Sequence, residues 1–157
     1  ILIAGVLFHF IMGFYLEIQN RKAAKYEYQK QKGSANSTWM SRNMITSGSV
    51  ILAFLVLHFI DFWVPEMNHK YIEFLPEDPD RYFKHLVHKF ENPLRVAMYC
   101  LAFVLLALHL LHGFTSSLRS MGTNKSYVAS AKTAGIVYSI GIPLGFCVIA
   151  IFHYLNH

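Results

Sequence analysis

Histidines inside apolar segments are the most distinctive residues of this chain. His9 opens the segment "HFIMG" and His109 opens "HLLHG", so each is followed four positions later by a glycine, Gly13 or Gly113. His112 lies three residues after His109. Ionisable side chains are costly in an apolar membrane segment and mark functional sites where they occur. A neutral imidazole nitrogen is also a common metal ligand, which is the chemistry that this spacing favours.

The segments around these histidines are long enough to cross a bilayer. Of the 157 residues, 54% are hydrophobic and 15% are charged, a balance that is unusual for a soluble domain. A spanning helix needs about 20 apolar residues, and four segments approach this length: 1–18, 44–64, 94–116 and 133–155. We therefore predict an all-α transmembrane helical bundle of four spanning helices, forming a single domain.

The charges of the connections predict how the bundle is oriented. Basic residues dominate connection 19–43, and connection 117–132 carries basic residues and no acid, so both are expected on the cytoplasmic side. Connection 65–93 balances acidic and basic residues, which places it on the periplasmic side. The net charge of +5 is explained by the cytoplasmic connections, and no nucleic-acid partner is predicted.

Connection 65–93 also contains a short amphipathic helix. Its apolar stripe is expected to lie on the membrane surface and consists of Tyr82, Phe83, Leu86, Val87 and Phe90. Asn92 and Pro93 then provide an N-cap and a first helical residue for the third span.

The depth of each histidine indicates which of them can share a cofactor. At a rise of roughly 1.5 Å per residue, His9 lies about 18 Å from Arg21 at the cytoplasmic edge, and His109 lies about 15 Å from Arg119. His58 lies about 24 Å from that edge, at a second level. Two imidazoles at one depth on different helices are what a bis-histidine haem requires. We predict that His9 and His109 bind a haem, with Gly13 and Gly113 leaving room for its edge.

Other polar residues have weaker assignments. His112 can bond a haem propionate or a quinone, replace His109 as the ligand, or simply pack. Ser41 and Arg42, at the mouth of the second span, can pair with haem propionates, and Arg42 alone can serve as a cytoplasmic anchor. Asp61 and Trp63 can border an outer haem or a quinone pocket, or belong to an interfacial aromatic belt.

Three segments together resemble a known family. They are "FHFIMGFYLEIQNRKA", "STWMSRNMITSG…VLHFIDFW" and "NPLRVAMYCLAFVLLALHLLHGFTSSLRSMG". They resemble the membrane cytochrome b subunit of succinate:quinone oxidoreductases, in particular the single-subunit di-haem anchor of Bacteroidetes-type succinate dehydrogenases and fumarate reductases. The resemblance covers essentially the whole chain.

The resemblance implies a set of ligands and one missing element. The family has five spanning helices, and the four of this chain match the second to the fifth. Two b haems are implied, with His9 and His109 holding the one nearer the cytoplasm and His58 holding one side of the outer one. The family's first helix, which carries the other outer ligand, has no counterpart in this sequence. Either this sequence is part of a longer chain that carries that helix, or the outer site is expected to lack one ligand.

The implied function is electron transfer in a bacterial inner membrane. A flavoprotein subunit and an iron–sulfur subunit would dock on the cytoplasmic face, and electrons would pass through the haems to a membrane quinone, for which menaquinone is expected. The chain itself would be a non-catalytic subunit, because none of its residues oxidises succinate. Two alternatives stay open: a cytochrome b anchor of another respiratory dehydrogenase, and a haem-free membrane scaffold or transporter subunit.

Overall fold

The computed structural model describes residues 1–27, 43–76, 78–120 and 125–156. Within these ranges the chain is all-α and contains no strand, as predicted. The helical elements in chain order are α1 (Leu2–Glu27), α3 (Met44–His58), the π-helix η1 (Phe59–Trp63), α4 (Val64–Met67), the π-helix η2 (Asn68–Ile72), α5 (Arg81–Phe90), α6 (Pro93–Ser120) and α7 (Lys125–Leu155).

Four helical stretches of the described chain are long and apolar enough to cross a membrane, which confirms the predicted number. They are Leu2–Ala23, Met44–Ile72, Pro93–Leu118 and Ser130–Leu155. Most of their side chains are exposed, as expected of surfaces that face lipid. The chain is therefore a multi-pass helical membrane protein.

The helices extend further than the apolar segments do. The first helix continues past residue 18 to Glu27, and the last begins at Lys125 rather than at 133. Charged residues such as Arg21 and Lys22 are good helix formers, so the edge of an apolar segment does not end a helix. In α1 the Arg21 guanidinium pairs with the Glu17 carboxylate one turn earlier, at 2.7 Å.

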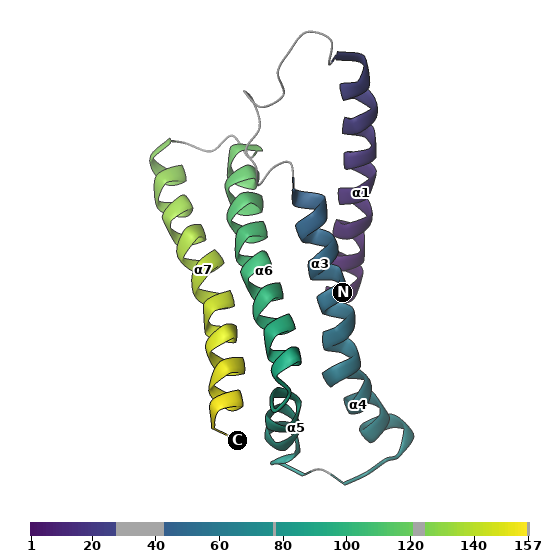
Figure 1. Cartoon of the computed structure of the whole chain (residues 1–157). Coiled ribbons are helices and arrows are strands. Elements are labelled where there is room, and N and C mark those ends of the chain that lie inside the picture. The colour runs from purple at the N-terminus through teal and green to yellow at the C-terminus, as the bar shows by residue number, and fades with distance from the viewer. Residues whose placement is uncertain (28–42, 77, 121–124, 157) are drawn as a thin grey trace. The chain divides into compact units, whose positions relative to one another are not determined.

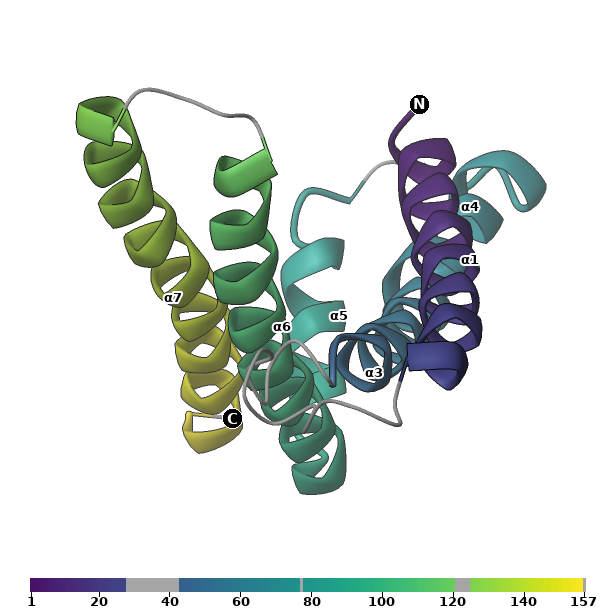
Figure 2. The ribbon, with the colours of Figure 1, turned by 90° about the horizontal axis from the view of Figure 1, so that it is seen from above.

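The chain forms two compact units, Ile1–Ser49 and Val50–His157. The first unit contains α1. In the second unit, α6 and α7 run antiparallel and lie side by side, with α5 near the start of α6 (Figure 1, Figure 2). The predicted N-cap of α6 is present, because the Asn92 Oδ1 accepts hydrogen bonds from the Leu94 and Arg95 backbone N–H groups at 2.9 and 3.2 Å.

Aromatic side chains fill the core of the second unit. The Phe54 ring of α3 meets the rings of Tyr99 and Phe103 in α6, with centroids 5.0 and 5.3 Å apart. Phe90 of α5 is also buried and meets Tyr99 edge-on at 5.3 Å. The apolar stripe of α5 is thus divided: Phe90 packs into the protein, whereas Tyr82 remains exposed. Large rings hold α3, α5 and α6 together in this unit.

The antiparallel pair α6 and α7 has a close side-chain contact at Gly135. A Cβ built on Gly135 would lie 2.0 Å from Cδ1 and 2.9 Å from Cγ of Phe114, so the phenyl ring occupies the space of the missing side chain. Gly141, two turns further along α7, has no atom within 4 Å of such a Cβ. Packing therefore requires a glycine at position 135 but not at position 141.

We expect Gly135→Ala to destabilise the protein by about 1–3 kcal/mol, because the added methyl group overpacks the helix pair. Gly141→Ala is the matched control, and its stability should stay equal or rise slightly, since alanine is the better helix former. Unfolding of the purified protein in mixed micelles of increasing SDS content measures both. Equal stabilities of the two variants would contradict this account of the contact.

Candidate functional site

Pro65 explains why the helix after His58 widens into the π-helix η1. Proline has no N–H, so Pro65 cannot donate to the carbonyl of Asp61 four residues earlier. The backbone shifts to a wider register here, in which the Val64 N–H donates to the carbonyl of Phe59, five residues back. Such π-helical turns are frequent at functional sites.

The Asp61 carbonyl accepts a hydrogen bond from another helix. The Nε2 atom of His85, in α5, lies 2.7 Å from the Asp61 carbonyl oxygen. A carbonyl oxygen can only accept, so Nε2 must carry the proton and Nδ1 is an acceptor in the neutral ring. This bond ties α5 to the π-helical turn and fixes the tautomer of His85.

The side chain of Asp61 is buried in a network with α5 and α6. Only 2% of it is exposed, and it forms an ion pair with the Arg95 guanidinium. The Tyr99 hydroxyl donates to its Oδ2 at 3.0 Å, and the Lys89 Nζ lies 3.5 Å from its Oδ1. We call these four residues the Asp61 network. Sequence analysis had offered Asp61 as the border of a pocket or belt, and the structure instead gives it this buried ionic role.

A second ion-pair group joins α4 to the start of α5. The Glu66 carboxylate pairs with Arg81 and with Lys70, the latter at 2.8 Å, and accepts a hydrogen bond from the Tyr82 hydroxyl at 2.7 Å. The hydrogen bond to Glu66 raises the pKa of Arg81 above its ordinary value. Arg81 therefore stays charged and holds the first turn of α5 against α4.

A cavity of about 360 Å³ lies between these elements. Small-molecule sites range from about 300 to 1,000 Å³ and combine apolar walls with a few polar groups. The wall here has that character, and its residues are His58, Phe59, Phe62, Trp63, Pro65, Glu66, Arg81, Tyr82, His85 and Leu86. Two imidazoles, those of His58 and His85, thus line one cavity, and Trp63 borders it.

The predicted ligand His58 lines this cavity, is exposed within the chain and contacts three aromatic rings. Its ring centroid is 5.2 Å from that of Phe62, 5.9 Å from that of Phe54 and 6.4 Å from that of Tyr99. These contacts place His58 at the level of Tyr99 on α6. His109 is ten residues further along α6, so the two histidines lie about 15 Å apart along the helix. His58 and His109 thus lie at two different depths within the second unit.

The two histidines in the middle of α6 lie away from α7. The side of α6 that meets α7 is marked by Cys100, Phe103 and Phe114, which contact Cys147, Phe146 and Gly135. At 100° per residue, His109 and His112 fall outside that side. Both are half-buried. A Cβ at Gly113 would meet no atom within 4 Å, so the space beside this glycine is open.

The remaining predicted site residues lie elsewhere. His9 and Gly13 belong to α1 in the first unit, and a Cβ at Gly13 likewise meets nothing within 4 Å. Ser41 and Arg42 lie outside the described residues. In the part of the chain that the structure describes, no three His, Cys, Asp or Glu side chains gather as ligands of one metal ion.

Sequence reasoning missed His85 and the partners of Asp61. His85 lies on a short helix between two spans, where nothing in its local sequence distinguishes it from the neighbouring His88. Pro65, four residues after Asp61, was the available signal, since a proline in a helix releases a carbonyl that another group must satisfy.

No protein-family model, curated protein or solved structure matches this chain. Its function therefore has to be argued from its own residues.

Removing the Asp61 charge should be strongly destabilising. We expect Asp61→Asn to lose about 3–5 kcal/mol, because Arg95 and Lys89 would then lack their buried counter-charge. Glu17→Gln is the control, since it breaks the exposed pair with Arg21, and should cost less than about 0.5 kcal/mol. Unfolding in SDS-containing mixed micelles reports both values, and equal losses would show that the Asp61 network contributes little.

Proposed function

We propose that this chain is a haem-b membrane anchor of a succinate dehydrogenase or fumarate reductase, which passes electrons between an iron–sulfur subunit and a membrane quinone. The observation that carries the proposal is the pair of His-x-x-x-Gly units, His9 with Gly13 and His109 with Gly113, in two different candidate spans, where the sequence predicts a similar depth for both histidines. Bound between two imidazoles, the haem would supply one-electron chemistry.

The residues of the second unit fit such a group in two respects. His109 lies on the side of α6 away from α7, so a haem bound by it would lie on that side of the helix. The open space at Gly113 would receive the edge of a flat ring without a clash. The protein's part is to hold the imidazole and keep water away from it, and the apolar spans provide these surroundings.

The cavity at His58 supports the quinone part of the proposal. Its apolar walls, among them Phe62 and Trp63, suit a ring, and its polar groups suit the oxygens of a quinone or quinol. His85 is the group best prepared for proton exchange. Its Nε2 proton is held by the Asp61 carbonyl, so its free acceptor, Nδ1, can accept a hydrogen bond from a quinol hydroxyl and take up that proton.

The haem ligand is tested by His109→Ala in the purified intact complex, with His153→Ala, a histidine near the end of the last span, as the control. We expect His109→Ala to lose one b haem, counted by pyridine haemochrome, and His153→Ala to keep the wild-type number. A parallel His112→Ala variant checks the rival ligand. Loss of haem in His112→Ala alone would contradict the assignment of His109.

The same preparation tests the identity of the complex. Flavoprotein and iron–sulfur subunits with succinate:quinone reductase activity should co-purify with the chain. Subunits of a hydrogenase or of a formate dehydrogenase would assign the anchor to another respiratory enzyme instead.

The role of His85 is tested by His85→Gln, because the glutamine amide can still donate to the Asp61 carbonyl but has no ring Nδ1. We expect the KM for quinol to rise about fivefold, as for the loss of one hydrogen bond of about 1 kcal/mol from the quinol hydroxyl to Nδ1. His88→Gln is the matched control, since His88 lies on the same helix with its side chain 80% exposed. Equal KM values in the two variants would remove His85 from the site.

A further inference from the structure

Phe74 has an unusual backbone conformation. Its φ is +50°, in the left-handed region, which glycine adopts readily and other residues rarely do. It ends η2, where the Glu73 N–H donates to the Asn68 carbonyl at 2.9 Å and the Leu75 N–H donates to the His69 carbonyl at 3.1 Å. A helix that ends in this way usually has glycine at this position.

Contacts of the phenyl ring within the protein do not compensate for the strained backbone of Phe74. The residue is 78% exposed, so packing within the chain does not explain why phenylalanine stands there. Strained residues that persist tend to lie at functional positions, where something outside the local fold favours them. The ring is therefore directed at a partner outside the chain.

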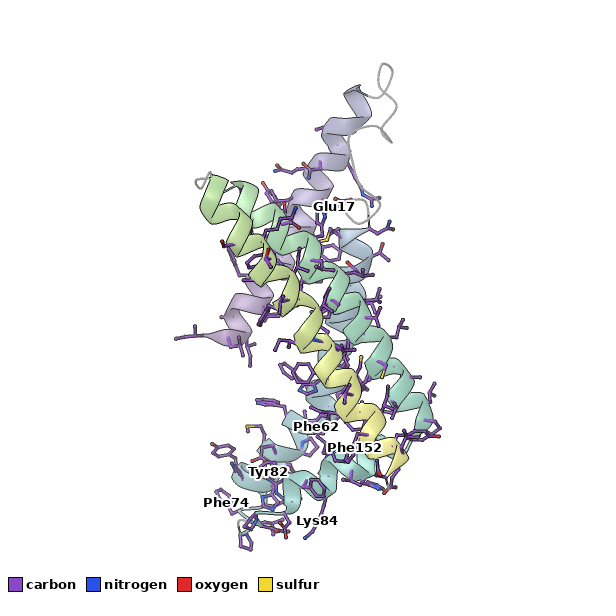
Figure 3. The ribbon with its side chains drawn as sticks, turned by 90° about the vertical axis from the view of Figure 1, so that its left-hand side faces the viewer. Glu17, Phe62, Phe74, Tyr82, Lys84 and Phe152 are labelled. Atoms are coloured by element: carbon purple, nitrogen blue, oxygen red, sulfur yellow. The ribbon has the colours of Figure 1, made fainter. Side chains whose placement is uncertain are left out.

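Phe74 belongs to a larger exposed apolar surface. We call this surface the outer rim, and it consists of Tyr71, Ile72, Phe74, Leu75 and Tyr82, all exposed. Leu75 and Tyr82 line one common pocket, which shows that the two segments adjoin. Figure 3 shows Phe74 and Tyr82 at the same end of this unit. Contiguous apolar surfaces of this kind mark contact with a partner or with a membrane.

The position and charge of the outer rim favour lipid. Tyr71 and Ile72 are the last two residues of the candidate span Met44–Ile72, so the rim continues the lipid-facing surface of that span. Lys70 and Arg81 both pair with Glu66, and Glu73 accepts a hydrogen bond from the Asn68 amide. The two cations and two carboxylates cancel, which leaves little net charge to attract a protein partner. Tyrosine and other aromatic residues concentrate at the level of the lipid headgroups.

We propose that the outer rim is an interfacial anchor that inserts Phe74 and its neighbours into the headgroup region of the bilayer. It thereby holds the turn between η2 and α5 at the membrane surface. Because Tyr82 belongs both to the rim and to the wall of the 360 Å³ cavity, the anchor also keeps that cavity at the level of the lipid. This inference does not depend on haem binding.

The test places a single tryptophan at position 74. The full chain carries Phe74→Trp with Trp39→Phe and Trp63→Phe, and is reconstituted in nanodiscs of phosphatidylcholine and phosphatidylglycerol brominated at graded acyl depths. We expect blue-shifted emission, quenched most by bromines near the headgroup and little by iodide. Leu144→Trp, exposed and near the middle of the span Ser130–Leu155, calibrates the deep position, and His88→Trp calibrates the aqueous one.

A second probe covers the case in which Phe74→Trp does not fold. Tyr71→Trp, in the same background, lies in the helical part of the rim and is 66% exposed, so it carries no backbone constraint. It should show the same lipid quenching. Iodide quenching equal to that of His88→Trp would overturn the proposal, and so would shielding from both lipid and iodide, since that would indicate a protein-covered surface.

Discussion

The buried carboxylate of Asp61 is the constraint on which the part of the second unit formed by η1, α5 and the start of α6 depends. A charge in an apolar span is tolerated only when it is paired, and here the partners come from α5 and α6. Because Arg95 and Tyr99 must reach this one carboxylate, the start of α6 is fixed against η1. Lys89 adds α5 to the same point. The network thus determines where three separate segments meet.

The backbone at Asp61 has a second consequence. Pro65 widens the helix, the Asp61 carbonyl is bonded by His85, and that bond sets the tautomer of an imidazole in the cavity wall. Asp61 therefore links the stability of the second unit to the proton exchange proposed at the cavity. Its side chain binds the cations, and its main chain orients the group that would exchange a proton with a quinol. His58 lies in the same wall, beside the rings of Phe54 and Phe62.

The spans and their number follow from the sequence because bilayer thickness demands a minimum apolar length, which needs no knowledge of tertiary contacts. The same holds for the N-cap at Asn92, a local signal that the structure confirms. The partners of Asp61 were beyond such reasoning, since Lys89, Arg95 and Tyr99 are 28, 34 and 38 residues away and meet it only in the folded unit. The left-handed backbone of Phe74 could not be predicted from the sequence either, because it is a property of the turn and not of the residue type. The ligand roles of His9, His58 and His109 remain predictions.

The electron paramagnetic resonance spectrum of the oxidised, intact complex tests the central claim most directly. We predict a low-spin ferric haem signal of the bis-imidazole type, because His9 and His109 are the residues proposed to hold the haem. A complex that contains this chain and shows no haem signal, in a preparation whose iron–sulfur centres are intact, would contradict the proposal that the chain is a cytochrome b anchor.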